Sequence, residues 1–147
     1  MPQPPATDAE LAGLLRERGH RVTSPRLLIH RLLRDRGEHL TAEQVRSALA
    51  EQLPGTSVPT IYATLELFEQ LGLVRRLDMG AGAALYDPRT DRHDHAVCRR
   101  CGRVEDLPGG TSLAAALRRA HDHGFAADHA EVVVSGLCAA CRDTGAG

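Results

Sequence analysis

The sequence contains no lysine, so all 18 residues of the Lys and Arg class are arginines. It also has no apolar run near the roughly 20 residues that a membrane-spanning helix requires. The amino-terminal stretch MPQPPATDAE has no basic segment followed by an apolar one, so a secretory signal peptide is not expected. These absences argue against a membrane or secreted protein and predict a cytoplasmic one.

The overall charge is nearly balanced, with 18 basic residues against 19 acidic ones, and gives no sign of nucleic-acid binding. The distribution is less even, because seven arginines lie from Arg16 to Arg36 against only Glu17 and Asp35. A local basic face can bind phosphate groups even when the whole chain is neutral. A solvated helix surface would give the same composition, so the charge pattern leaves both interpretations open.

Four helices are predicted in the first half of the chain. Capping boxes begin at Thr7 and Thr41, where a threonine oxygen can accept an amide hydrogen bond and the Glu or Gln three residues later can reach back. Thr23 and Ser57 are candidate caps for the other two helices, and glycines stop three of the four. The predicted ranges are 7–19, 23–37, 41–53 and 57–72.

The periodicity then changes from helical to extended. The segments LVRRLD and AALYD read as short strands on either side of the turn MGAGA. Helices followed by a two-stranded hairpin predict a winged helix, in which the last helix before the wing enters the DNA major groove. A helical bundle with an incidental hairpin would produce the same pattern.

The segment YDPRTDR, residues 86–92, is polar and contains a proline, and we interpret it as a hinge. It separates a predicted DNA-binding domain, 1–86, from a second domain, 87–147. In the second domain strands are expected within 95–98, 103–107 and 130–138, with a helix over 111–124. The predicted fold class is α+β, with a winged helix followed by a small α/β domain.

The four cysteines form two Cys-x-x-Cys pairs, Cys98 with Cys101 and Cys138 with Cys141. Two such pairs can form a closed tetrahedral site of four sulfurs, which suits structural zinc. Disulfides or two redox dithiols are the alternatives, although neither pair clearly follows a strand and starts a helix as a thioredoxin-like motif does.

His93 and His95 are two residues apart, so on a strand they share a face and Asp94 points the other way. Two neighbouring imidazoles with acidic residues nearby make a plausible site of nitrogen and oxygen ligands. The spacing alone is a weak signal, because most histidines are not metal ligands.

Five stretches together resemble the ferric uptake regulator (Fur) family, and the resemblance covers nearly the whole chain. They are RGHRVTSPRLLI, EHLTAEQV, SVPTIYATLELFEQLGLV, YDPRTDRHDHAVCRRCGRVEDL and GLCAAC. The resemblance implies a homodimeric, metal-activated winged-helix repressor. Its implied partner is double-stranded operator DNA, which we expect to be an AT-rich palindrome.

The resemblance also implies two metal sites. The four cysteines would hold the structural zinc, and a regulatory ion would be held by His39, Asp87, His93, His95 and Asp106. Three imidazoles and two carboxylates without sulfur suit iron(II) or manganese(II). An aspartate at the hinge position resembles the peroxide-sensing branch of the family. An iron-, manganese- or zinc-uptake regulator is the alternative within the family.

Some positions depart from the pattern. Arg92 stands where iron-uptake members often have another histidine, which puts in doubt an additional metal site using Asp94 and His129. Ala63 replaces a larger polar residue of the recognition helix, so operator preference cannot be copied from relatives. DNA contacts are expected from Ser57, Thr60, Tyr62, Arg21 and Arg26, and the histidines at positions 20, 30, 121 and 123 are interpreted as surface residues.

The sequence also bears on two other classes of protein. An enzyme is not expected, because the His-Glu-x-x-His motif of zinc proteases is absent, and Leu137 rather than proline precedes the second cysteine pair, unlike in zinc deaminases. A zinc-ribbon module that binds other proteins and not DNA is the remaining alternative. Such a module would not require His39, the fourth helix or the wing.

Overall fold

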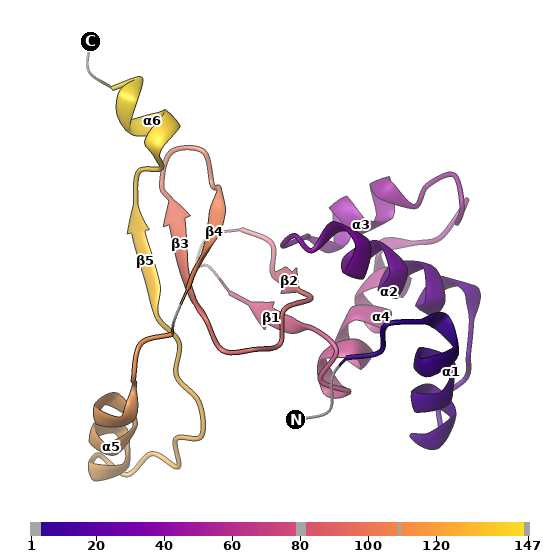
Figure 1. The fold of residues 1–147 in the computed structure, drawn as a ribbon, viewed down its shortest axis with the longest axis horizontal. Coiled ribbons are helices and arrows are strands. Elements are labelled where there is room, and N and C mark those ends of the chain that lie inside the picture. Colours follow the sequence, from indigo (N-terminus) through magenta and orange to yellow (C-terminus); the bar gives the residue numbers. More distant parts are fainter. Residues whose placement is uncertain (1–3, 79–81, 109, 146–147) are drawn as a thin grey trace. The chain divides into compact units, whose positions relative to one another are not determined.

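The structure is a computed structural model that describes residues 4–78, 82–108 and 110–145 (Figure 1). The chain divides into two compact units, Met1–Thr90 and Asp91–Gly147. The division falls inside the predicted hinge 86–92. Within the described residues, no helix has both the length and the apolar character needed to cross a membrane.

Unit 1 begins with four helices, α1 (Asp8–Glu17), α2 (Ser24–Arg36), α3 (Ala42–Ala48) and α4 (Val58–Gln70). Both capping boxes are present: the hydroxyls of Thr7 and Thr41 each accept the predicted amide, and the backbone amides of the same threonines donate to the side chains of Glu10 and Gln44. Ser57 caps α4 as expected. Two details were wrong: Thr23 occupies the cap position of α2 without a side-chain hydrogen bond, and α3 ends at Ala48 rather than near residue 53.

The four helices enclose one apolar core. On α4, Ile61, Leu65 and Phe68 are buried in this core, while Leu71 is half-buried at its border. Each of the other helices directs its own apolar face into the same core, through Leu11, Leu15, Ile29, Leu33 and Val45. Because side chains from all four helices share this core, α4 is held in a fixed position relative to the other three helices.

A two-stranded antiparallel hairpin follows α4. Strand β1 (Arg75–Leu77) pairs with β2 (Leu85–Asp87) in the register Arg75↔Asp87. Of the predicted turn MGAGA, residues 79–81 lie outside the described residues. Helices followed by this hairpin form a winged helix, and the predicted α+β class is confirmed.

Unit 2 contains a three-stranded sheet in the order β4-β3-β5 (Figure 1). Strand β3 (Asp94–Cys98) pairs antiparallel with β4 (Val104–Leu107) and parallel with β5 (Val133–Gly136). Helix α5 (Ala114–Asp122) lies in the connection from β4 to β5, and the short helix α6 (Ala139–Asp143) follows β5.

The helix predicted over 111–124 is therefore shorter than expected. It starts at Ala114 because both the amide and the hydroxyl of Thr111 donate to the Asp94 carboxylate, at 2.7 and 2.5 Å. Thr111 thus fixes the loop to β3 instead of entering the helix.

The interpretation of His30 as a surface residue was also wrong. Its side chain lies on α2 in the interior of unit 1 and is 6% exposed. His121 and His123 are exposed as expected, and His20 is half-buried.

Candidate metal centres and DNA-binding surface

The four cysteines converge at one end of the sheet in unit 2. Cys98 ends β3, and Cys101 lies in the turn that follows it. Cys138 precedes α6 and Cys141 lies within it. Because β3 and β5 run parallel, with Cys98 opposite Gly136, both pairs leave the sheet at the same edge. The four sulfurs all lie within 4.8 Å of one another.

The pKa values of two of these thiols are shifted in opposite directions. Backbone amides of Cys101 and Cys138 lower the pKa of Cys98 to about 6. The side-chain hydrogen bond to Cys138 raises the pKa of Cys141 to about 12. Neighbouring sulfurs cannot all ionise together without a compensating positive charge. A divalent cation supplies that charge, and four thiolates with no oxygen ligand suit zinc in a closed structural site.

In unit 1, His39 and Asp87 lie side by side because the backbone holds them there. An isolated bridge joins Leu40 to Tyr86 through two hydrogen bonds of 3.1 and 2.8 Å, so the residues flanking this bridge are neighbours. The Nε2 atom of His39 lies 3.3 Å from Oδ2 of Asp87. The other carboxylate oxygen, Oδ1, accepts the amide of Arg89 at 2.8 Å. One oxygen therefore orients the side chain and the other faces the imidazole.

In unit 2, His93, His95 and Asp106 form a second group of potential ligands. Residue His95 is opposite Asp106 in the β3–β4 register, and the two imidazole centroids are 4.6 Å apart. The Nε2 atoms of His93 and His95 lie 3.3 and 3.7 Å from Oδ1 of Asp106. The Nδ1 atom of His93 lies 2.7 Å from the carbonyl of Asp91, which fixes the ring so that Nε2 faces the carboxylate.

Asp94 points away from these imidazoles, as the strand alternation predicts. The hydroxyl of Thr111 is the largest cause of a lowered pKa for Asp94, and Arg92 donates to the Thr111 carbonyl at 2.8 Å. His129 instead lies 3.2 Å from Glu131. Among the described residues, no group of three or more metal-binding side chains includes Asp94 or His129.

Around the start of α4, the predicted DNA-contacting residues have different environments. The Ser57 hydroxyl accepts the amide of Thr60 at 3.4 Å, and the two side-chain oxygens are 3.0 Å apart. Thr60 is exposed, whereas Tyr62 is half-buried and packs against the core. The Arg26 guanidinium donates to the Arg21 carbonyl, so one arginine of the predicted set fixes the loop that carries the other.

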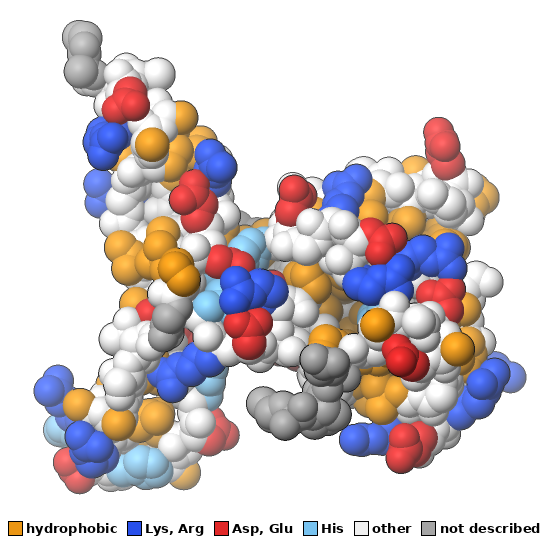
Figure 2. Space-filling view, viewed as in Figure 1, with side chains coloured by type: hydrophobic (Ala, Val, Ile, Leu, Met, Phe, Trp, Pro, Cys, Tyr) orange, Lys and Arg blue, Asp and Glu red, His pale blue; other side chains and the backbone are white. Residues whose placement is uncertain are grey.

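The basic stretch from Arg16 to Arg36 is less uniform than its sequence suggests. Arg31 pairs with Asp8, and Arg34 pairs with Asp35 at 2.8 Å. Figure 2 accordingly shows acidic and basic side chains interspersed on the visible face of the helices. Sequence reasoning missed Asp8, because it lies outside the arginine-rich segment.

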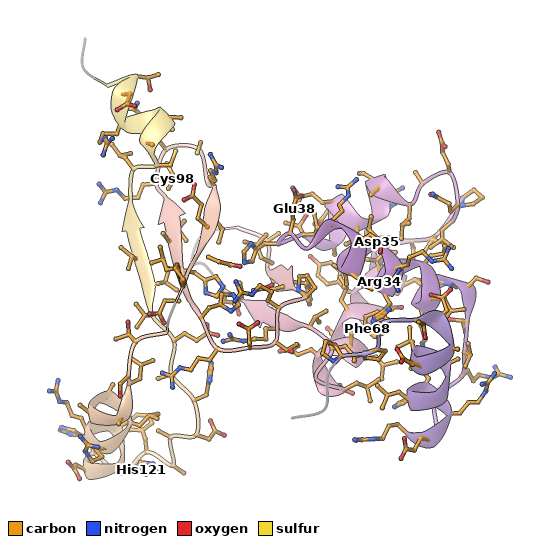
Figure 3. All side chains as sticks on the ribbon, viewed as in Figure 1. Arg34, Asp35, Glu38, Phe68, Cys98 and His121 are labelled. Atoms are coloured by element: carbon orange, nitrogen blue, oxygen red, sulfur yellow. The ribbon has the colours of Figure 1, made fainter. Side chains whose placement is uncertain are left out.

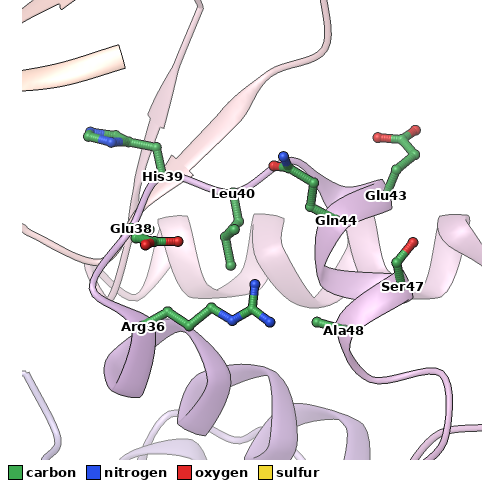
Figure 4. A pocket seen from close by; sticks show the side chains of 8 residues that line it. All are labelled: Arg36, Glu38, His39, Leu40, Glu43, Gln44, Ser47 and Ala48. Atoms are coloured by element: carbon green, nitrogen blue, oxygen red, sulfur yellow. The ribbon is translucent and has the colours of Figure 1, made fainter. Parts of the chain in front are cut away.

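Sequence reasoning also missed an open pocket of about 540 Å³ in unit 1, beside α3 and the end of α2. Figure 4 shows that the side chain of Leu40 points into this space and that the imidazole of His39 points away from it. The pocket is lined by Arg36, Glu38, His39, Leu40, Glu43, Gln44, Ser47 and Ala48. His39 therefore borders the pocket, whereas Asp87 is not among its lining residues.

A winged helix, a small sheet unit, four clustered cysteines and paired histidine and aspartate side chains are together the features of a metal-dependent DNA-binding regulator. Comparison with known proteins supports this class. The ferric uptake regulator family matches residues 17–135, and the chain belongs to that family. The predicted family and the prediction of a metal-dependent transcription regulator are confirmed, and the relatives are regulators rather than enzymes.

Two relatives show the range within the family. The chain is 35% identical to ferric uptake regulation protein 1 of Mycolicibacterium fortuitum, over 94% of this chain and 86% of the relative. It is 31% identical to the peroxide-responsive repressor PerR of Staphylococcus epidermidis, over 89% and 87%. Among solved structures, the ferric uptake regulator of Francisella tularensis with iron matches with a TM-score of 0.69 at 26% identity, covering 84% of this chain and 96% of that one.

Proposed function

We propose that this protein is a cytoplasmic, homodimeric repressor that binds operator DNA when a regulatory metal ion is bound. Residues 1–86 act as the DNA-binding domain and residues 87–147 as the dimerisation and metal-binding domain. The similarity to both iron-uptake and peroxide-responsive repressors supports this role. The zinc-ribbon alternative is not favoured, because it gives no role to the winged helix or to the His39–Asp87 pair.

Structural zinc is proposed at Cys98, Cys101, Cys138 and Cys141. The close approach of the four sulfurs supports this assignment, since clustered thiols without a cation resist ionising together. Zinc bound by four protein thiolates leaves no open position for water, so its role is to stabilise the fold rather than to catalyse a reaction.

The regulatory ion, iron(II) or manganese(II), is proposed to take ligands from both units. His39 and Asp87 come from unit 1, and His93, His95 and Asp106 come from unit 2. The preference for these metals follows from nitrogen and oxygen ligands without sulfur. Each ligand group is already oriented within its own unit, by the Leu40–Tyr86 bridge and by the β3–β4 register. A shared ion would therefore restrict the angle between two prearranged bodies.

This restriction explains how metal binding could control DNA binding. A dimer binds a palindrome well only when both recognition helices match successive major grooves. An ion shifts the population toward that arrangement only by its difference in affinity for the two states, and a shift from mostly inactive to mostly active needs about 5.5 kcal/mol. A ligand set that is complete in only one arrangement gives such a difference.

Helix α4 is proposed as the recognition helix on an AT-rich palindrome. Its amino-terminal turn presents exposed Thr60 beside Ser57, and Tyr62 follows on the same helix. Arg21 and Arg26 precede α2 or lie within its first turn, and they are proposed to contact phosphates. Such contacts give sequence-independent affinity that decreases as salt rises.

We further propose that the protein responds to hydrogen peroxide. Asp87 at the hinge and the sulfur-free ligand set favour this function, and the similarity to peroxide-responsive repressors supports it. Bound iron(II) supplies the redox chemistry with peroxide. The imidazoles of His39, His93 and His95 are the ligands that this chemistry can oxidise. Loss of one imidazole ligand then weakens metal binding and releases the protein from DNA.

An uptake regulator is the second candidate, because one relative with higher identity is a ferric uptake regulation protein. The two functions are separated by treating the iron(II) and manganese(II) forms of one preparation briefly with peroxide. The peroxide sensor loses operator binding only in the iron form, and mass spectrometry finds added oxygen on His39, His93 or His95. If both forms stay bound and no histidine gains oxygen, the protein is an uptake regulator.

A further inference from the structure

Helix α6 carries half of the four-cysteine site but has little packing of its own. It has five residues, Ala139–Asp143, none of which is buried. An isolated helix of this length is unstable in water. The sheet holds the chain only as far as Gly136, whose carbonyl accepts the amide of Arg99 at 2.8 Å. Some other interaction must therefore hold Cys141 in position.

Arg100 provides that interaction from the first cysteine pair. Its Nη1 atom donates to the backbone carbonyl of Cys141 at 2.7 Å and lies 3.2 Å from the hydroxyl oxygen of Thr144. These contacts join residues 41 and 44 positions apart in the chain. Arg100 lies between Cys98 and Cys101 in the chain, so one guanidinium links the two halves of the site.

The same contact suits the end of a helix. The last carbonyls of a helix have no partner within it, and a positive charge near them is favourable. Cys141 lies in α6 and Thr144 is its carboxy-terminal cap residue. Arg100 therefore caps α6 and, through the same bonds, fixes the backbone of a proposed zinc ligand.

We propose that Arg100 is a positioning residue for the four-cysteine site, which prearranges Cys141 and slows the loss of zinc. Groups that hold metal ligands in place typically change metal affinity by about 10–100-fold when they are removed. The exposed guanidinium of Arg100 contacts the backbone carbonyl of Cys141 and not its sulfur. The expected change in zinc affinity is therefore at the lower end of this range, about tenfold. This inference depends on the zinc site proposed above.

Arg99 offers a matched control. It is the adjacent residue, is also exposed and carries the same charge, but its guanidinium makes no hydrogen bond or ion pair with the described residues. Arg99→Ala and Arg100→Ala therefore remove the same charge from the same turn. Only Arg100→Ala removes the link to α6.

The experiment measures zinc release from the full-length protein into an excess of a colorimetric zinc chelator. Arg100→Ala should release zinc about tenfold faster than the wild type, and Arg99→Ala should release it at the wild-type rate. Arg100→Lys should have an intermediate release rate, because an ammonium can replace one of the guanidinium donors. Equal rates for Arg100→Ala and the wild type, or equal acceleration by Arg99→Ala, would overturn the proposal.

Two further outcomes keep the test decisive. If Arg100→Ala does not retain zinc during purification, Arg100→Lys is compared with Arg99→Lys: faster release from Arg100→Lys supports the proposal and equal rates overturn it. A wild-type protein purified without zinc would instead contradict the zinc site itself. A zinc-loaded wild type with unchanged variants contradicts only the role of Arg100.

Discussion

Replacing His30 with leucine should make unit 1 more stable and less sensitive to acid. The imidazole on α2 lies edge-on against Phe68 of α4, with ring centroids 6.0 Å apart. Its Nδ1 atom is buried without a hydrogen-bond partner among the described residues. Burial lowers the pKa of His30, and the charge of Arg34 lowers it further, against the opposing effects of Asp8 and Asp35. Figure 3 labels Phe68, Arg34 and Asp35.

The sign of the pH dependence follows from that lowered pKa. An unfolded histidine has a pKa of about 6.5, and the folded protein favours the neutral ring. The unfolded chain therefore takes up a proton first as the pH falls. The contribution of His30 to the free energy of unfolding is therefore fully present above about pH 6.5. It is lost as the pH falls from there to the pKa of His30 in the folded protein. Within that interval, each pH unit lowers the free energy of unfolding by up to about 1.4 kcal/mol.

His30→Leu removes both the titrating group and the buried, unsatisfied nitrogen. An unsatisfied buried polar group costs about 1–3 kcal/mol, so the variant should be more stable by that order at neutral pH. Near pH 5.5, one unit below the ordinary histidine pKa, its advantage should grow by up to about 1.4 kcal/mol.

Tyrosine fluorescence is the appropriate signal, because the chain has no tryptophan and both tyrosines, Tyr62 and Tyr86, lie in unit 1. Urea unfolding of the wild type and of His30→Leu is compared near pH 7.5 and near pH 5.5, on either side of the ordinary histidine pKa. Both proteins carry the same metal ligands, so the effect of pH on those ligands cancels in the difference. A difference that is the same at both pH values would refute the reasoning.

Three other predictions concern DNA and metals. Tyr62→Ala should weaken operator binding by ~1–3 kcal/mol in a fluorescence anisotropy titration. Because the ring packs against the core, Tyr62→Phe is included to separate loss of the hydroxyl from loss of packing. Unchanged affinity of both variants would exclude Tyr62 from the interface. Cys98→Ser should remove zinc and the dimer, since structural zinc contributes on the order of 10 kcal/mol; a folded, zinc-free dimer in sedimentation analysis would contradict this. Because Thr111 already holds the Asp94 carboxylate, Asp94→Asn should leave the number of bound ions measured by mass spectrometry unchanged, and the loss of one ion would show an additional site.

Local signals in the sequence predicted most of unit 1. Capping boxes and glycines are short-range features, so the helix starts at Thr7 and Thr41 and the stop at Gly37 could be read directly. The end of α3 and the uncapped Thr23 were missed.

The ligand groups were only partly predictable. The alternation of a strand correctly placed His93 and His95 on one face and Asp94 on the other. The nearness of His39 to Asp87 depends on a bridge between residues that are 46 positions apart, and only the family resemblance indicated it.

Long-range partners explain the errors. Thr111 looked like the start of a helix but is held by Asp94, which is 17 positions earlier in the chain. His30 was interpreted as a surface residue because it matches no ligand position of the family pattern. The packing of α2 against α4 through Phe68 buries it instead. Neither interaction leaves a signal in the neighbouring sequence.

The central claim is that an ion bound by hinge and sheet residues controls DNA binding. The most direct test is operator affinity as a function of manganese concentration for the wild type, Asp87→Ala and the exposed control Asp78→Ala, on a duplex selected by the manganese-loaded wild type. Asp87→Asn is included because an amide oxygen can still accept the Arg89 amide. The account predicts that manganese strengthens binding of the wild type and Asp78→Ala, and that Asp87→Ala keeps its zinc and dimer but does not respond. A full manganese response of Asp87→Ala would contradict it.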